Sequence, residues 1–77
     1  MTNEDIALKL RHHATALARG GDNLYRVRAF RQAAMAVLTL KEPVADIVSQ
    51  RGPAALEGIP GIGKSLAETI ALLSRSA

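Results

Sequence analysis

A glycine-rich turn followed by a lysine and a serine is the part of the chain with the clearest chemistry. Gly58, Gly61 and Gly63 fall within six residues with Pro60 among them, and an apolar run of helical period follows Lys64. This composition predicts a tight turn that leads into a helix. The first N–H groups of such a helix have no partner within the helix, and the helix dipole adds partial positive charge there. We therefore expect an anion, and a phosphate in particular, to bind this stretch.

Residues 58–65 also fit the phosphate-binding loop of nucleotide hydrolases, G-x-x-x-x-G-K-[ST]. That motif requires a buried strand before it, a helix after it and a later acidic ligand for Mg²⁺. Residues 51–57 contain no β-branched run and include Pro53, and only 14 residues follow Gly63. The sequence therefore argues against a nucleotide hydrolase.

A second pattern, L-x-x-I-P-G-I-G-x-x-x-A-x-x-I, runs from Leu56 to Ile70. It resembles the helix-hairpin-helix motif, which in known families binds the sugar–phosphate backbone of DNA without reading its sequence. Ile62 is expected to plug the hairpin into the seam between the flanking helices, so that Gly61 and Gly63 face solvent. The alternative is a purely structural corner between two helices, which needs only one glycine after the first helix. The sequence Gly-Ile-Gly-Lys has a second glycine and a lysine that such a corner does not require, and it therefore favours phosphate binding.

The composition limits the fold classes, metal sites and cellular settings that remain possible. The chain has 77 residues, 48% of them hydrophobic, with fourteen alanines and no cysteine. One small domain over residues 1–77 with closely packed helices is expected, and disulfides and thiolate metal sites are excluded. The start of the chain is polar and acidic instead of basic, and no apolar run approaches the roughly 18 residues of a membrane span. We expect a soluble monomer without a membrane partner, in a bacterial-type cytoplasm and associated with the nucleoid.

The net charge of +3 and the high isoelectric point suit a nucleic-acid partner. Residues 23–41 hold four basic side chains and no acidic one. Arg28 and Arg31 are three residues apart, so they can lie side by side on a helix, whereas Arg26 projects away from Arg28. A solvated helix face remains the alternative for these arginines. The predicted DNA-binding residues are those of the hairpin and two of the arginines: Gly61, Gly63, Lys64, Ser65, Arg28 and Arg31.

The pattern of caps and apolar residues predicts an all-α fold, a compact bundle of four main helices that contains one helix-hairpin-helix motif. The first helix is capped by Asn3 or Thr2, the second by Asn23, and the third has Pro43 at its first position. A short helical turn at residues 54–57 leads into the hairpin, about residues 58–64. His12 and His13 are adjacent and point about 100° apart on a helix, so they are expected at the surface or at the boundary of the core and not at a metal.

Core positions recur at helical spacing in each predicted helix. They are Ile6, Leu10, Ala14 and Leu17 in the first helix; Val27, Phe30, Ala34, Val37 and Leu38 in the second; Val44, Ile47 and Val48 in the third; and Leu66, Ile70 and Leu73 in the last.

Two segments together, N-L-Y-R-V-R-A-F-R-Q-A-A at residues 23–34 and I-P-G-I-G at residues 59–63, resemble the N-terminal lyase-like domain of family X DNA polymerases, of the polymerase beta type. The likeness runs from Ile6 to about Leu73. It implies a role in DNA repair, with binding to the 5′-phosphate side of gapped or nicked duplex DNA.

Some members of that family excise a 5′-deoxyribose phosphate through a lysine that forms a Schiff base with the sugar. The matching position here is Thr69, and a hydroxyl group cannot form an imine. Phe30 stands where the family has a tyrosine, and the nearby amine, Lys64, is expected on a different face of the helix. We therefore predict weak or absent lyase activity and no catalytic residue.

The resemblance also implies a monovalent cation, Na⁺ or K⁺, held by backbone carbonyls of the hairpin. The matching carbonyls are those of Glu57, Ile59 and Ile62. No other cofactor is expected.

The prediction is thus a DNA-binding domain that contacts the backbone without sequence specificity, in repair or gap recognition. Two alternatives stay open: the N-terminal fragment of a family X polymerase, and a protein-interaction module in which the hairpin is only structural. Polymerase and nuclease activities are not expected of this chain, because it has no carboxylate cluster for two-metal chemistry.

Overall fold

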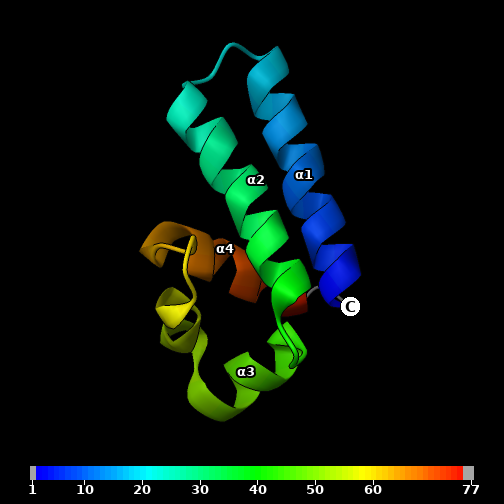
Figure 1. Cartoon of the computed structure of the whole chain (residues 1–77), viewed down its shortest axis with the longest axis vertical. Helices are drawn as coiled ribbons and strands as arrows, with labels where there is room; N and C mark the ends of the chain where they lie inside the picture. The colour runs from blue at the N-terminus through cyan, green and yellow to red at the C-terminus, as the bar shows by residue number, and fades with distance from the viewer. Residues whose placement is uncertain (1, 76–77) are drawn as a thin grey trace.

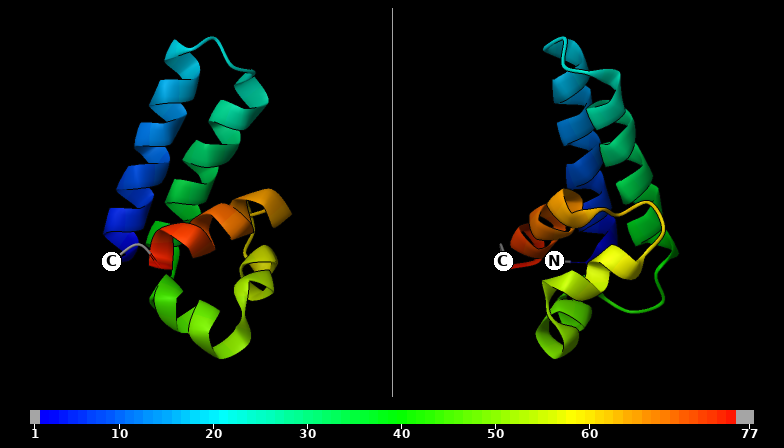
Figure 2. Two further views of the ribbon diagram at one scale, coloured as in Figure 1. Left: turned by 180° about the vertical axis from the view of Figure 1, so that it is seen from behind. Right: turned by 90° about the vertical axis from the view of Figure 1, so that its left-hand side faces the viewer.

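The computed structural model describes residues 2–75, which form four α-helices and one 3₁₀ helix and contain no strand. In chain order these are α1 (Asn3–Arg19), α2 (Leu24–Thr39), α3 (Val44–Arg51), η1 (Pro53–Gly58) and α4 (Lys64–Arg75). Helices α1 and α2 run antiparallel as a helical hairpin, and α3 and η1 lie beyond its open end (Figure 1). Helix α4 crosses one flank of the α1–α2 pair, as the view from behind shows (Figure 2). The predicted all-α architecture with four main helices is confirmed.

Helix α1 begins with a capping box. The Thr2 hydroxyl oxygen accepts a hydrogen bond from the Asp5 N–H at 3.1 Å, and the Asp5 carboxylate accepts one from the Thr2 N–H at 3.0 Å. Two backbone donors that the helix leaves free are thereby satisfied. Of the two predicted caps, Thr2 is therefore the one used.

The Asn3 side chain instead caps the N-terminus of α3, which lies far from Asn3 in the sequence. The Val44 N–H donates to Asn3 Oδ1 at 2.8 Å, and Asn3 Nδ2 donates to the Glu42 carbonyl at 2.9 Å. Pro43 occupies the position before the first helical residue, one place earlier than predicted, and supplies no side-chain cap. The side chain from α1 replaces the cap that a proline cannot provide.

The turn between α1 and α2 combines a helix stop and a helix start. Gly21 has φ +75°, and the Asp22 N–H donates back to the Leu17 carbonyl at 3.0 Å, which is the pattern of a Schellman motif. The Asn23 side chain then accepts hydrogen bonds from the N–H groups of Tyr25 and Arg26, as predicted for the cap of α2.

The core consists of apolar side chains that are at most 8% exposed, from all five elements and the hairpin. They are Ile6, Ala7, Leu10, Ala14, Val27, Phe30, Ala33, Ala34, Val37, Val44, Ile47, Leu56, Ile62, Ala67, Ile70 and Ala71. Within residues 2–75, no helix is long and apolar enough to span a membrane.

One residue of the predicted core is wrong: Leu38 is 50% exposed, and it lies about 100° around α2 from the buried Val37. Leu17, Val48, Leu66 and Leu73 are partly buried and pack against the core. Ala67 and Ala71 join Ile70 as the buried residues of α4. Small residues there let α4 approach its neighbours closely.

Candidate nucleic-acid interface

The hairpin between η1 and α4 is built around a tight turn. The Ile62 N–H donates to the Ile59 carbonyl at 3.0 Å, and Gly61 between them has φ +91°. A proline followed by a glycine at positive φ is typical of a type II turn. Ile62 is 4% exposed, which confirms that it anchors the hairpin in the core, while Gly61 and Gly63 are exposed. The turn therefore fixes where α4 begins.

Helix α4 starts with unused backbone donors. The Ala67 N–H donates to the Gly63 carbonyl at 2.8 Å, so Gly63 is the residue that precedes the helix. Within residues 2–75, the N–H groups of Lys64, Ser65 and Leu66 have no hydrogen-bond partner. Free N–H groups at the positive end of a helix dipole are suited to an anion.

A groove of about 450 Å³ lies between this helix start and the α1–α2 pair. We call it the hairpin groove. Its lining residues come from three helices and the hairpin, and none of them is acidic: His13, Arg26, Ala29, Phe30, Gly63, Lys64, Ser65, Leu66 and Thr69. Arg26 from α2 and Lys64 from α4 therefore bring two positive charges to the same groove as the free N–H groups.

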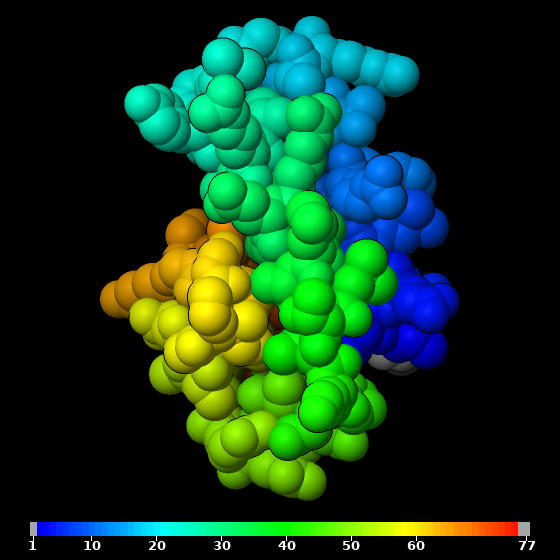
Figure 3. All heavy atoms as spheres, in the orientation of Figure 1, coloured from blue at the N-terminus to red at the C-terminus, as the bar shows by residue number. Residues whose placement is uncertain are grey.

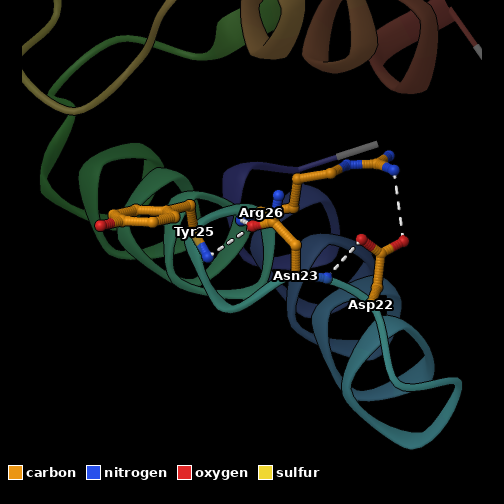
Figure 4. Close-up of polar contacts among 4 residues, drawn as sticks. All are labelled: Asp22, Asn23, Tyr25 and Arg26. Atoms are coloured by element: carbon orange, nitrogen blue, oxygen red, sulfur yellow. Dashed lines mark hydrogen bonds and ion pairs between the residues drawn. The ribbon is translucent and has the colours of Figure 1, made fainter.

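Arg26 forms an exposed ion pair with Asp22. Its Nη1 lies 3.3 Å from Asp22 Oδ2, and the two side chains are 57% and 30% exposed (Figure 4). The other carboxylate oxygen of Asp22 accepts a hydrogen bond from the Asn23 N–H at 2.6 Å. An ion pair this exposed contributes little to stability, so the guanidinium is available to another anion.

The remaining polar groups of the groove come from α1 and from the second turn of α4. The His13 ring lies 4.6 Å from the Phe30 ring, centroid to centroid, at an interplanar angle of 43°. The Thr69 hydroxyl donates to the Ser65 carbonyl of its own helix at 3.1 Å. Lys64 also lines this groove, although five residues separate it from Thr69 and place the two about 140° apart around α4.

The structure brings together only part of the predicted DNA-binding set. Gly63, Lys64 and Ser65 line the hairpin groove, with Gly61 in the adjoining turn. Arg31 instead lines a second groove on α1 and α2, together with Arg11. Arg28 is exposed and lies two residues from Arg26, which places the two about 200° apart around α2.

Arg26 and His13 line the groove but are not among the residues that the sequence predicts to bind DNA. A signal for Arg26 was present, because it precedes the buried Phe30 by four residues and so shares a helix face with it. No comparable signal exists for His13, whose place depends on how α4 packs across α1.

The hairpin also holds the carbonyls expected to bind a cation. The Ile59 carbonyl accepts the Ile62 N–H, and a carbonyl oxygen has a second lone pair for another partner. The Glu57 and Ile62 carbonyls belong to the same short segment, and oxygen ligands of this kind suit a hard cation. Residues 2–75 contain no group of three or more His, Cys, Asp and Glu side chains that could hold a metal.

Comparison with known families agrees with this hairpin. A family model for the helix-hairpin-helix domain matches residues 1–75. No curated protein and no solved structure matches the chain significantly. The match covers nearly the whole sequence and includes the hairpin, so the chain belongs to the helix-hairpin-helix domain family.

Proposed function

We propose that this chain binds the backbone of DNA without reading its sequence, through the hairpin groove. The observation that carries the proposal is the convergence of three free N–H groups at the start of α4 with the cations of Lys64 and Arg26. Membership of the helix-hairpin-helix family supports it, because such domains generally bind DNA.

Each part of the groove has a role in this proposal. A backbone phosphate accepts hydrogen bonds from the N–H groups of Lys64 and Ser65, and the Lys64 ammonium balances its charge. Gly63 has no Cβ, and a Cβ built there would meet nothing within 4 Å, so the approach to these N–H groups is open. Arg26 exchanges its Asp22 partner for a phosphate oxygen. Phosphate contacts of this kind position a protein on DNA but carry no sequence information.

The resemblance to family X polymerases makes the proposal more specific. We propose that the preferred substrate is gapped or nicked duplex DNA and that the role is in repair. The chain is proposed to act as a monomer that binds the DNA end without cleaving it, because Thr69 stands where those lyases need an amine. A monovalent cation on the carbonyls of Glu57, Ile59 and Ile62 would add positive charge beside a phosphate.

Fluorescence anisotropy with a short gapped duplex tests the proposal. Two unrelated sequences should bind equally, and log affinity should fall with log salt with a slope of about −2 to −3 if three phosphates are neutralised. Lys64→Glu should lower the affinity at least tenfold and reduce the magnitude of the slope by about 1. Arg11→Glu is the matched control, because it makes the same charge change on the second groove.

Three results would count against the proposal. Equal losses of DNA affinity in Lys64→Glu and Arg11→Glu would show a general effect of net charge instead of a binding site at the hairpin. Strong preference for one of the two sequences would show readout of bases. Absence of binding at low salt would favour the alternative of a protein-interaction module.

A further inference from the structure

A second groove on the α1–α2 pair combines exposed apolar side chains with arginines. It encloses about 470 Å³ and is lined by Arg11, Thr15, Arg31, Met35 and Leu38. We call it the outer groove. Met35 is 68% exposed and Leu38 50% exposed. Leu8, also 53% exposed, precedes Arg11 by three residues and so extends the same face of α1.

The outer groove lies on the opposite flank of the helix pair from the hairpin groove. Arg11 and Thr15 are each two residues from His13, so they point about 200° away from it around α1. On α2, Arg31 stands in the same relation to Ala29, which lines the hairpin groove. In Figure 3, α1 and α2 meet along one side of the visible face, while the hairpin lies on the other side of α2. Helix α4 thus covers one flank of the pair and leaves the other open.

The chemistry of the outer groove differs from that of a phosphate site. Its apolar lining residues are Met35 and Leu38, and its charged lining residues, Arg11 and Arg31, are both positive. A DNA backbone presents mainly charged phosphates and has only the small faces of its sugars to place against the two apolar side chains, while the bases of a duplex are stacked inside it. An amphipathic helix with carboxylates beside its apolar stripe matches both the apolar side chains and the arginines. A third helix laid in the groove between two antiparallel helices would also complete a helical bundle.

We propose that the outer groove docks an acidic amphipathic helix of a partner protein. The proposal goes beyond DNA binding and does not depend on it. Because the two grooves lie on opposite flanks, a partner in the outer groove leaves the hairpin groove free for DNA.

The test uses a synthetic peptide on the full chain. The probe has leucines at helical positions i, i+3 and i+7 with glutamates beside them, and binding is followed by amide chemical shifts in NMR. Shifts should concentrate at Arg11, Thr15, Arg31 and the Met35–Leu38 turn, and not at Lys64. One control peptide replaces the leucines by glutamine and another replaces the glutamates by lysine, and both should bind at least tenfold more weakly.

Variants of exposed residues separate the contribution of the arginines to peptide binding from that of the apolar side chains. Arg11→Glu with Arg31→Glu should weaken peptide binding at least tenfold, and Met35→Gln with Leu38→Gln should do the same. The matched control is Arg19→Glu with Arg75→Glu, which makes the same charge change at the ends of α1 and α4 and should leave peptide affinity unchanged. Met35→Gln with Leu38→Gln should also leave DNA affinity unchanged, so failure of one proposal is distinguishable from failure of the other.

Several outcomes would overturn the proposal. Failure of the acidic peptide to bind would do so, as would equal binding of the lysine peptide or shifts centred on the hairpin. Shifts at the outer groove caused by duplex DNA would mean that DNA is the ligand there. Concentration-dependent dimerisation lost in Met35→Gln with Leu38→Gln would mean that a second copy of the chain covers this face.

Discussion

The side chain of Asn3, in the first turn of α1, caps a different helix: its Oδ1 accepts the Val44 N–H of α3 at 2.8 Å across 41 residues of sequence. The amide of the same side chain donates to the Glu42 carbonyl at 2.9 Å. Thr2 caps α1, so Asn3 is free for this contact. One carboxamide thus ties the start of the chain to the loop before α3, where Pro43 offers no cap.

Asn3→Ala should therefore lower the free energy of unfolding by about 1–2 kcal/mol, because it removes a cap and a second hydrogen bond. Urea unfolding at neutral pH measures the change. Ser49→Ala is the control, since the Ser49 hydroxyl is exposed and donates only to the Asp46 carbonyl of its own helix. Equal losses of unfolding free energy in the two variants would mean that the long-range cap adds no stability beyond that of an ordinary exposed hydrogen bond.

The capping box of α1 predicts a pH dependence. The pKa of Asp5 is lowered from its ordinary value of 3.8, first because the Thr2 N–H donates to the carboxylate and then because of the Thr2 side chain. A carboxyl group with a lowered folded-state pKa stabilises the fold above its unfolded pKa, and this contribution disappears as pH falls through the folded pKa. Asp5→Asn should therefore destabilise the protein at neutral pH, and the difference from wild type should shrink once the pH is below 3.8.

Thermal unfolding of both proteins across that pH range measures this effect. Glu4→Gln serves as the control, because Glu4 lies in the same first turn but takes no part in the capping box. A difference between Asp5→Asn and wild type that stays constant down to about pH 2 would contradict the assignment.

Asp22 restrains the arginine of the hairpin groove, so Asp22→Asn should raise the affinity for gapped DNA. The variant frees Arg26 but keeps an oxygen that can accept the Asn23 N–H. The gain should be at most about fivefold, which corresponds to the energy of an exposed ion pair. Anisotropy with the gapped duplex measures it.

Glu42→Gln is the matched control for Asp22→Asn. It removes one negative charge and releases Arg51, whose Nη2 lies 2.6 Å from Glu42 Oε2 and whose side chain does not line the hairpin groove. A similar gain in both variants would show that net charge, and not Arg26, sets the affinity.

The sequence predicts those features that depend on neighbouring residues. The caps at Thr2 and Asn23 follow from residue type and position alone. Ile62 follows from the hairpin pattern. Features that depend on which flank α4 covers could not be predicted in this way.

The arginines show this limit most clearly. Arg26, Arg28 and Arg31 share one helix, and residue spacing gives their angles relative to one another but not which of them meets α4. The crossing of α4 places Arg26 in the hairpin groove and leaves Arg31 in the outer groove. The exposure of Leu38 has the same origin, because none of the elements within residues 2–75 covers that flank.

The two hairpin glycines should respond to substitution in different ways. Gly61 has φ +91°, which side chains other than glycine rarely adopt, so Gly61→Ala should cost about 1–2 kcal/mol of stability. Gly63 has open space around it and no positive φ. Serine at this position is a favourable cap, and its hydroxyl would accept the N–H groups proposed to bind phosphate.

Gly63→Ser should therefore keep or slightly raise the free energy of unfolding and still weaken DNA binding several-fold. Urea unfolding and anisotropy on the same preparations separate the two effects. Unchanged DNA affinity in Gly63→Ser would argue that the N–H groups at the start of α4 do not contact phosphate.

The side chain of Thr69 gives the last prediction. Borohydride should trap no covalent adduct between the wild-type chain and DNA with an abasic site, because a hydroxyl group cannot form the imine that borohydride reduces. Thr69→Lys should yield such an adduct. Thr69 is partly exposed and its hydroxyl bonds only to its own helix, so the longer side chain can be accommodated.

The cations of Lys64 and Arg26 around this position should also lower the pKa of the introduced amine and so favour its nucleophilic, neutral form. Thr69→Met, of similar length and without an amine, is the control and should give no adduct. Lys64 lines the same groove, so peptide mapping must identify the residue that carries the DNA. An adduct of the wild-type chain at Lys64 would show that this amine replaces the missing one and would contradict the proposal that the chain binds DNA without cleaving it.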